Sequence, residues 1–385
     1  MKVLHVINSL SGSGGAEQGL VREITGFDST AEQLVVHLYP QDELGPRLQA
    51  AGIALRCLEL HSSNSGWNWP AGVMRLRKVI RDFGPDVIHS SLASANLVAQ
   101  LATVGSRLPV LSTFTLSGDV GLMRSYQPGA ASRRAAFLRW LGSHAARRRS
   151  VWFRAITRDA LVTNCRAIGV GTSRGWVIPR GVPIMSSDAS PVSPGDLDLP
   201  EGVPIILNVG RQTAQKGHVH LVEAFATVTR HREAHLVILG REGDATSALR
   251  ASIDVEDVAD RVTVIPYTNS PFDYYRVADI FVFPSLMEGL GTAVLEAMAS
   301  GLPVVAYDIP PVREASGGSD YARLVPLGDV PSLAEAIADI LDHPDPANAI
   351  AREAKDRVIR DFSVDVVAAR LQARLAGLVS ASGGM

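Results

Sequence analysis

The stretch MEGLGTAVLEAMASGLPVVA, from Met287 to Ala306, carries two glutamates eight positions apart in largely apolar sequence. It follows the β-rich run DIFVF, so it predicts a strand, a glycine loop and then a helix that begins near Gly291–Thr292. Free N–H groups in the first turn of such a helix bind phosphate oxygens. Glu288 would lie just before this helix and Glu296 one turn inside it, where a carboxylate can accept hydrogen bonds from vicinal hydroxyls. The pattern therefore indicates a site for a ligand with both phosphate and hydroxyl groups.

Short β-rich runs alternate with longer helical stretches along the 385 residues, which predicts parallel sheets with crossover helices. The first series is KVLHVI, QLVVHLY, DVIHSS and PVLSTFT, and the second is PIILNVG, AHLVILG, RVTVIP, DIFVFPS and PVVAYD. A segment rich in Pro, Ser, Asp and Gly separates the two series, and an amphipathic helix closes the chain. We therefore expect an α/β protein with a first doubly wound domain at 1–182, a linker at 183–203, a second domain at 204–362 and a C-terminal helix at 363–385.

The composition is that of a globular protein, with 46% hydrophobic and 20% charged residues. No run of 18 or more apolar residues is present, so no membrane-spanning helix is expected. The N-terminal apolar run is too short for a secretory signal, and Cys57 and Cys165 give neither a disulfide framework nor a metal-binding spacing. A cytoplasmic protein is therefore expected, and no nucleic-acid partner is indicated.

The formal net charge of −2 hides an asymmetry between the two halves. Up to Met185 there are 21 Lys and Arg against 11 Asp and Glu, a difference of +10, and the remainder holds 16 against 28, a difference of −12. Much of the excess lies at 131–158, where Phe137, Trp140 and Leu141 are interspersed with arginines. This segment fits a helix on an anionic membrane surface, or a site for an anionic acceptor. A solvated arginine face on a helix whose apolar side is core would fit it equally well.

The loop GRQTAQKGH, from Gly210 to His218, follows a predicted strand of the second series. Ligands of doubly wound sheets bind at the carboxyl ends of the strands. Arg211 and Lys216 could there neutralise a diphosphate, with a planar fork from the arginine and a point charge from the lysine. Two solvated surface cations would give the same pattern.

The loop SLSGSGGAEQGL, from Ser9 to Leu20, follows the first predicted strand. Gly14 and Gly15 would let the backbone approach an anion at the start of a helix, although a structural turn explains them as well. Glu17 stands where a dinucleotide fingerprint has its third glycine, which argues against a nicotinamide or flavin cofactor.

Together, GGAE at 14–17, GRQTAQKG at 210–217 and EGLGTAVLEAMASGLPV at 288–304 resemble the motifs of retaining glycosyltransferases of glycosyltransferase family 4. The resemblance covers nearly the full length, and IPRGVP at 178–183 lies where the family has an I-P-N-G-V run. The family includes bacterial polysaccharide and lipid glycosyltransferases such as phosphatidylinositol mannosyltransferase. The resemblance implies the GT-B fold, in which two Rossmann-like doubly wound domains face each other across a cleft and the C-terminal helix crosses back to the first domain.

The resemblance also implies transfer from a nucleoside-diphosphate sugar, with UDP or GDP expected, without a metal or a cofactor. Arg211 and Lys216 would stabilise the departing diphosphate, which is electrostatic catalysis. Glu288 would hold the donor sugar, and Glu296 the ribose hydroxyls. The further donor-binding residues expected from the resemblance are Gly14, Gly15, Gly210, Tyr267, Leu290, Gly291 and Thr292.

The chain departs from the family pattern at two positions. Many relatives have a histidine after a first-domain strand, in a run like T-F-H, whereas VLSTFTLSGDVG has Thr115 at that place. Threonine can hydrogen-bond a sugar hydroxyl but is no base near neutral pH. Thr115 could position the donor, Asp119 or His89 could fill the gap on the acceptor side, or transfer could be slow or absent. Arg180 replaces the asparagine of the I-P-N-G-V run, which would suit an anionic acceptor.

Two metal-like patterns are interpreted as accidental. Asp196-Leu197-Asp198 matches the D-x-D of metal-dependent transferases, but it lies in the Pro- and Ser-rich segment with no strand before it. His218 and His220 are two positions apart, so they would not share a helix face as metal ligands.

We therefore expect a metal-independent hexosyltransferase, cytoplasmic or peripheral on the inner membrane face. Its acceptor would be a lipid-linked or phosphate-bearing saccharide of cell-envelope or exopolysaccharide biosynthesis. A nucleotide-sugar epimerase on the same fold and a non-catalytic donor-binding partner of another transferase are the alternatives.

Overall fold

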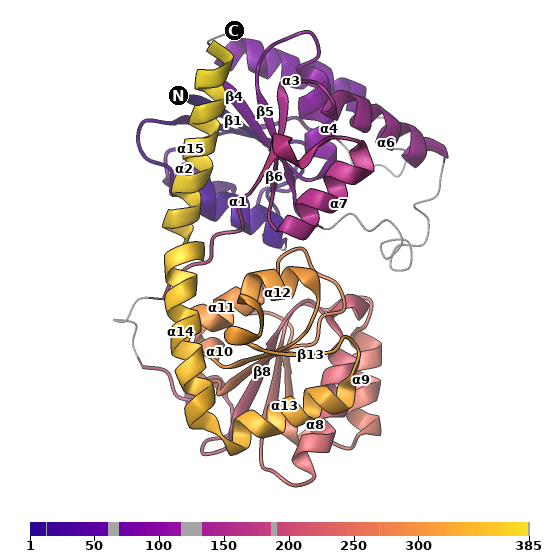
Figure 1. The fold of residues 1–385 in the computed structure, drawn as a ribbon, viewed down its shortest axis with the longest axis vertical. Coiled ribbons are helices and arrows are strands. Elements are labelled where there is room, and N and C mark those ends of the chain that lie inside the picture. The colour runs from indigo at the N-terminus through magenta and orange to yellow at the C-terminus, as the bar shows by residue number, and fades with distance from the viewer. Residues whose placement is uncertain (13, 61–68, 117–132, 186–190, 269, 384–385) are drawn as a thin grey trace. The chain divides into compact units, whose positions relative to one another are not determined.

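The computed structural model describes residues 1–12, 14–60, 69–116, 133–185, 191–268 and 270–383, with only the backbone described at 133–139 and 383. The chain divides into two compact α/β units (Figure 1). Unit 1 comprises Met1–Gly181 together with Val364–Met385, and unit 2 comprises Val182–Ser363. The segment predicted to be a linker, 183–203, falls within unit 2, where Leu199 is buried.

Unit 1 is built on a seven-stranded parallel sheet in the order β3-β2-β1-β4-β5-β6-β7. Its strands are β1 Lys2–Ile7, β2 Glu32–His37, β3 Ala54–Cys57, β4 Val87–Ser91, β5 Val110–Phe114, β6 Val151–Ala155 and β7 Gly175–Val177. The order reverses between β1 and β4. In doubly wound sheets, the carboxyl ends of the strands at such a reversal form the ligand-binding edge.

Helices cover both faces of this sheet, since inner strands such as β1 and β4 are buried almost continuously along their length. They are α1 Gly15–Thr25, α2 Gly45–Ala50, α3 Trp69–Phe83, α4 Ala93–Ala102, α6 Arg133–Ala146, α7 Arg158–Ile168 and α15 Val364–Gly383. Helices α3, α4 and α7 pack on one face, while α1, α2 and α15 pack on the other. The C-terminal helix α15 thereby belongs to the core of unit 1, because it buries Val367, Leu371 and Leu375 at helical spacing against the sheet.

Unit 2 repeats the same plan with a six-stranded parallel sheet in the order β10-β9-β8-β11-β12-β13. Its strands are β8 Ile205–Val209, β9 His235–Leu239, β10 Val262–Ile265, β11 Ile280–Phe283, β12 Val304–Tyr307 and β13 Arg323–Val325. Its helices are α8 His218–Thr229, α9 Thr246–Val255, α10 Pro271–Val277, α11 Thr292–Ser300, α12 Pro310–Ser316, α13 Val330–Asp342 and α14 Pro344–Phe362. Helices α8, α9 and α13 share one core cluster, and α11 packs against α12 and α14. The strand order reverses between β8 and β11.

The basic segment 131–158 is not the single amphipathic helix that its composition suggests. Helix α6 ends at Ala146, and the strand β6 begins at Val151 and lies between β5 and the edge strand β7 in the sheet of unit 1. The sequence pattern misses this strand because Arg154 interrupts its apolar run, yet Arg154 is fully buried. None of the helices in the described ranges has the length and hydropathy needed to cross a membrane.

Candidate active site

Two loops meet at the strand-order reversal of unit 2, one after β8 and one after β11. The backbone N–H of Leu286 donates to the carbonyl oxygen of Gln215 at 2.8 Å, which ties the loops together. Gly217 has a φ of +66°, and a Cβ at this position would lie 2.1 Å from the carbonyl oxygen of Pro284. Only glycine therefore allows this close approach. The contact holds the loop that carries Lys216 directly against the end of β11.

Lys216 and Glu288 form an ion pair between these loops, with 2.5 Å between Nζ and Oε1. Their side chains are mostly buried, at 18% and 11% exposure, so the attraction is less screened than on an open surface. The ammonium also lies 5.2 Å from the centroid of the Phe283 ring, which gives it a cation–π contact. A phosphate group could replace Glu288 as the partner of Lys216 and would leave the carboxylate to accept from a sugar hydroxyl.

Hydrogen bonds anchor the loop that carries Arg211 to the loop after β9. They include those from Gln212 N to Arg241 O at 2.9 Å, from Gln212 Nε2 to Gly240 O at 2.8 Å, from Ala214 N to Asp244 Oδ1 at 3.1 Å and from Ala245 N to Gln212 O at 3.1 Å. A Cβ on Gly240 would lie 2.0 Å from the carbonyl oxygen of Gly210, so this packing requires glycine at position 240. The loop is thereby fixed while the side chain of Arg211 itself is exposed.

Helix α11 begins at Thr292, directly after this pair of loops, and Gly291 precedes it in the left-handed conformation with a φ of +80°. Its first-turn N–H groups are available to an anion, as they are in any helix start. Glu296 lies one turn inside, and its Oε2 is 3.4 Å from the hydroxyl of the buried Tyr275. The arrangement of Leu290, Gly291, Thr292 and Glu296 around the helix start is therefore suited to a diphosphate with hydroxyl groups beside it.

Tyr267 follows β10, and its exposed ring lies 4.6 Å from the guanidinium carbon of Arg241, which follows β9. The pair offers a planar cation on an aromatic face at the carboxyl edge of the sheet. The sequence analysis missed Arg241, because its partner is on another strand and no spacing links the two residues.

The candidate residues of unit 1 lie at the carboxyl edge of its own sheet. Gly14 is the N-cap of α1 and Gly15 is its first residue. Within the described residues, no atom lies within 4 Å of where a Cβ on Gly15 would be. Thr115 follows β5 directly and is half-buried. Asp119 lies outside the described residues.

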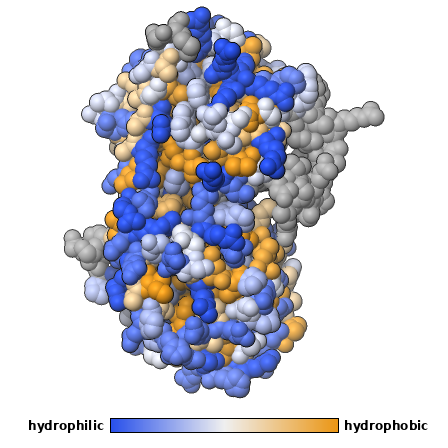
Figure 2. Space-filling view, in the orientation of Figure 1, coloured by the Kyte–Doolittle hydropathy of each residue, from blue (hydrophilic) through white to orange (hydrophobic). Residues whose placement is uncertain are grey.

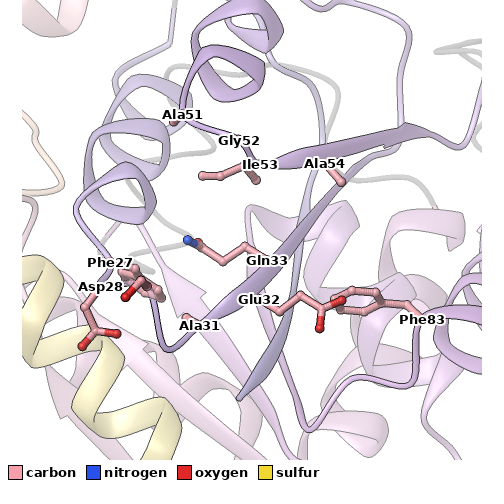
Figure 3. Close-up of a pocket in the computed structure, with 11 residues that line it drawn as sticks. Phe27, Asp28, Ala31, Glu32, Gln33, Ala51, Gly52, Ile53, Ala54 and Phe83 are labelled. Carbon is pink, nitrogen blue, oxygen red and sulfur yellow. The ribbon is translucent and has the colours of Figure 1, made fainter.

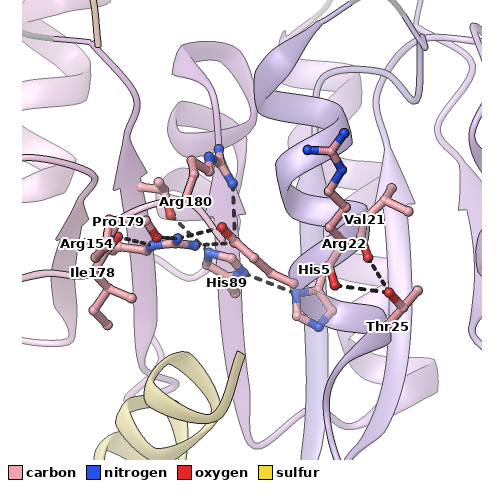
Figure 4. Close-up of polar contacts among 11 residues, drawn as sticks. His5, Val21, Arg22, Thr25, His89, Arg154, Ile178, Pro179 and Arg180 are labelled. Atoms are coloured by element: carbon pink, nitrogen blue, oxygen red, sulfur yellow. Dashed lines mark hydrogen bonds and ion pairs between the residues drawn. The ribbon is translucent and has the colours of Figure 1, made fainter. Parts of the chain in front are cut away.

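His89 and Arg180 are core groups of unit 1, so the prediction that they contact an acceptor is not supported. His89 has its Nδ1 3.1 Å from Nδ1 of His5 and its Nε2 2.9 Å from Oγ1 of Thr113 (Figure 4). Arg180 Nη1 lies 3.3 Å from Oε2 of Glu23, and both side chains are buried. Both side chains are almost fully buried and have partners within unit 1.

Glu23 is the centre of this buried network, because Arg154 and Arg180 both contact its carboxylate. Arg154 holds its carboxylate with two hydrogen bonds, from Nη1 at 2.6 Å and from Nη2 at 2.8 Å. Burial alone would raise the pKa of Glu23, but the charges of Arg154 and Arg180 keep that pKa below its ordinary value. Burial lowers the pKa of His5 to about 4, and burial together with the nearby His5 lowers the pKa of His89 well below its ordinary value. The two histidines are therefore neutral at physiological pH.

Comparison with known proteins identifies the family. The model of the glycosyl transferase 4-like domain matches residues 14–181, and the model of glycosyl transferases group 1 matches residues 191–357. The chain belongs to the family 4-like glycosyltransferases. The second match contains Arg211, Lys216, Glu288 and Glu296, the residues of the loop pair described above.

Two relatives and one solved structure agree with this membership. The glycosyltransferase is 26% identical to 2-deoxystreptamine glucosyltransferase from Streptomyces kanamyceticus, over 94% of this chain and 95% of the relative. It is 28% identical to phosphatidyl-myo-inositol mannosyltransferase from Mycolicibacterium smegmatis, over 77% and 72% of the two chains. The structure of Anabaena Alr3699/HepE in complex with UDP matches with a TM-score of 0.82 at 18% identity, over 98% and 100% of the two chains, which shows the same fold. The predicted family, the GT-B fold and the assignment as a glycosyltransferase are thereby confirmed.

Several arginines of the basic segment have structural partners in the glycosyltransferase. Arg148 donates to the carbonyl oxygen of Thr103 at 2.7 Å, and Arg147 Nε donates to that of Ile168 at 2.9 Å. Arg154 is in the buried network. Trp140 on α6 is exposed, and Figure 2 shows hydrophilic and hydrophobic residues intermixed over the visible face. Part of the excess of positively charged residues in unit 1 therefore consists of arginines that donate hydrogen bonds to backbone carbonyl oxygens.

A pocket in unit 1 lies at the amino ends of β2 and β3 (Figure 3). Its lining includes Phe27, Glu32, Gln33, Ile53 and Phe83. Glu32 pairs with Lys2 at 3.3 Å, and Gln33 Oε1 lies 3.2 Å from Nε2 of His5. Because ligands of doubly wound sheets bind at the opposite edge, this pocket is not the donor site.

The D-x-D pattern has a local role in the described structure. Asp196 Oδ2 accepts from the backbone N–H of Ser193 at 2.8 Å and from its hydroxyl at 2.9 Å, in the turn that leads to Asp198. Over the described ranges, no group of three or more His, Cys, Asp or Glu side chains is placed to hold a metal ion.

Proposed function

We propose that this glycosyltransferase transfers a hexose from a nucleoside-diphosphate sugar with retention of anomeric configuration and without a metal ion. The observation that carries the proposal is the Lys216–Glu288 pair, which lies at the strand-order reversal of unit 2 beside the start of α11. A cation for the leaving diphosphate and a carboxylate for the sugar are here in direct contact. The names of the relatives, a glucosyltransferase and a mannosyltransferase, support a hexose as the transferred group.

In the proposed reaction, the bond from the anomeric carbon to the diphosphate breaks, and the bond to an acceptor oxygen forms. Arg211, Lys216 and the first-turn N–H groups of α11 take up the charge that develops on the diphosphate. Glu288 accepts from a hydroxyl of the sugar, and Glu296 accepts from the ribose hydroxyls. The acceptor proton leaves with the diphosphate, so no separate base is needed. Thr115, from unit 1, hydrogen-bonds the donor sugar as a positioning group.

The proposed acceptor carries a phosphate or a lipid-linked diphosphate, as in cell-envelope biosynthesis. The +10 balance of the first 185 residues and the name of the mycobacterial relative support it. Exposed Trp140 on α6, next to arginines in the sequence, supports peripheral contact with the inner face of an anionic membrane. The name of the Streptomyces relative supports a second candidate, an aminocyclitol acceptor without phosphate.

The first test is calorimetric titration with UDP, GDP, ADP and dTDP. We expect one of them to bind, and binding to be lost in Lys216→Ala and Glu296→Ala. The corresponding nucleotide sugars are then offered with vesicles that contain phosphatidylinositol, or with 2-deoxystreptamine, in the presence of EDTA. Proton NMR of the product reports the anomeric configuration.

Each alternative has its own outcome in this assay. Interconversion of the sugar without any acceptor would identify an epimerase, and tight nucleotide binding without turnover on any acceptor would identify a non-catalytic partner. Loss of turnover in EDTA would contradict the metal-independent reaction. An inverted product would contradict retention.

A further inference from the structure

Buried side-chain polar atoms without a hydrogen-bond partner mark the strand-order reversal of unit 2. In the described part of this unit they belong to Asn208, Gln212, His218 and Ser285. All four residues lie near the end of β8, in the loop that follows it, at the start of α8 or just after β11. Native interiors leave few such atoms unpaired, so their concentration beside the candidate site calls for a functional explanation.

His218 is the residue with the largest deficit. Its side chain is 2% exposed, and neither ring nitrogen has a partner among the residues that the structure describes. Leaving a buried polar atom unpaired destabilises the folded protein. The sequence analysis set this histidine aside because its spacing from His220 does not suit a metal site. The difference between the two is clear in the structure, since His220 Nδ1 has the hydroxyl of Tyr307 at 3.0 Å.

His218 lies between the two loops of the candidate site in the chain and in the fold, directly after Lys216 and Gly217. It is the first residue of α8, and the contact of Gly217 with Pro284 fixes this helix start against the end of β11. Side chains of helices lean toward the N-terminus, so the ring of a first residue leans beyond the helix start. Lys216 is near enough to act on it, because burial first and then the charge of Lys216 lower the pKa of His218 to about 4.

An anion is the ligand that this environment favours. The first-turn N–H groups of α8 and the ammonium of Lys216 both attract negative charge. A neutral imidazole adds one N–H donor without adding a like charge beside Lys216. The carboxylate of Glu288 is paired with Lys216 and does not serve as the hydrogen-bond partner of His218.

We propose that His218 is a donor-binding residue whose imidazole N–H hydrogen-bonds a diphosphate oxygen of the nucleotide sugar, beside Lys216 at the start of α8. The inference rests on the proposed function. When Lys216 leaves Glu288 for the phosphate, the imidazole N–H gains a hydrogen-bond acceptor that the described protein groups do not supply. His218 then acts on the leaving group together with Lys216, and Glu288 is released to the sugar.

The test is calorimetric binding of UDP and of inorganic pyrophosphate to the full chain and to three variants. His218→Phe removes the hydrogen bond at similar volume, and we expect both ligands to bind about 10- to 100-fold more weakly. His218→Gln keeps an N–H donor, and binding should stay within about threefold of the wild type. His220→Gln is the matched control on the same helix and should bind both ligands as the wild type does.

A second readout separates contact with the ligand from a role in folding. The imidazole ¹⁵N signals of His218, assigned by their absence from the His218→Gln spectrum, should shift on addition of pyrophosphate, while those of His220 should not. Unchanged signals, or full affinity of His218→Phe with a raised melting temperature, would show a strained core histidine and overturn the inference.

The failure of the proposed function looks different. If the wild type binds neither UDP nor pyrophosphate, the donor site itself is wrong, and the inference falls with it. If Lys216→Ala loses binding but His218→Phe does not, only the inference about His218 fails.

Discussion

Lys216 Nζ and Glu288 Oε1 lie 2.5 Å apart, although the two residues are separated by 72 positions in the chain. The pair joins the loops of two neighbouring strands and is mostly buried. It brings the cation proposed to bind the diphosphate into direct contact with the carboxylate proposed to bind the sugar. Their mutual attraction holds both side chains near the positions where they are proposed to act, and the binding of a diphosphate exchanges one anionic partner of Lys216 for another.

Lys216→Met should abolish detectable nucleotide binding or lower kcat by about 10²- to 10³-fold, because a preorganised charge on the leaving group is lost. Glu288→Gln should retain nucleotide binding and lose turnover, because it removes the sugar contact but leaves Lys216 in place. Calorimetry and a transfer assay measure the two effects. Arg232→Met is the control for loss of a cation in unit 2, since Arg232 pairs with Asp342 on the surface at 2.6 Å. Equal effects of Lys216→Met and Arg232→Met would show that only the loss of a positive charge in unit 2 matters.

Gly217→Ala should disrupt the site more than a second glycine substitution with the same backbone conformation. Both Gly217 and Gly318 have a left-handed φ, at +66° and +83°. In the described structure a Cβ at 318 meets no atom within 4 Å, whereas one at 217 meets the carbonyl oxygen of Pro284. We expect Gly318→Ala to cost about 1 kcal/mol of stability and Gly217→Ala to weaken UDP binding as well. Chemical denaturation measures the stability of the two variants, and calorimetry measures their UDP binding. Equal effects of Gly217→Ala and Gly318→Ala would contradict the contact between the loops.

Glu23→Gln should lower the free energy of unfolding by about 3–5 kcal/mol, because two buried guanidinium groups lose their charged partner. The matched control is Glu32→Gln, whose exposed pair with Lys2 should contribute less than about 1 kcal/mol. Urea denaturation measures both. A loss for Glu23→Gln as small as that of the control would mean that solvent reaches Arg154 and Arg180.

The free energy of unfolding should fall as the pH drops from about 6.5 to about 4, because a buried neutral histidine becomes protonated on unfolding. His5 is neutral in the folded state, with a pKa of about 4, and binds a proton near pH 6.5 once unfolded. The unfolded state therefore binds more protons between pH 6.5 and 4, so the folded state loses up to about 1.4 kcal/mol per pH unit for each such histidine. His5→Gln should flatten the slope of unfolding free energy against pH in this window. An unchanged slope would assign it to other groups.

Glu23 contributes in a separate and more acidic window. Its pKa is lower in the folded than in the unfolded state, so its contribution is complete above the ordinary carboxyl pKa and is lost as the pH falls through the folded value. The Glu23→Gln variant should therefore lose the part of the acid sensitivity that lies below about pH 4.5. Denaturation at pH 5 and pH 3 separates this effect from that of the histidines.

Leu371→Ala in α15 should destabilise unit 1 by about 2–5 kcal/mol, as expected for a fully buried leucine. Ile350→Ala in α14 is the control, since this side chain is 44% exposed. Hydrogen exchange should show faster opening in β1, β4 and β5 for Leu371→Ala, with β8 and β11 unchanged. Faster exchange in unit 2 instead would contradict the assignment of α15 to the core of unit 1.

Local pattern was sufficient for those parts of the site that lie within one strand, loop and helix. The sequence around Glu288 and Glu296 predicts a strand, a turn and a helix start. The apolar periodicity, the glycines and the position of each carboxylate are all visible within this short stretch. The central strands were predictable for the same reason. The short edge strands β7 and β13 were not, since three residues give too little pattern to read.

Contacts between distant segments required the tertiary structure. In the sequence, Arg154 is part of the basic segment and Arg180 is a candidate acceptor ligand. In the structure both contact Glu23 in the core of unit 1, although 131 and 157 positions separate them from it. The unpartnered imidazole of His218 is invisible in the sequence as well, because a missing partner is a property of the packed interior. Sequence determined the family, the α/β alternation and the residues of the donor motif, since these depend on local order along the chain. Only the fold decided which charges meet and which remain unpaired, because burial and the order of strands in a sheet depend on the whole chain.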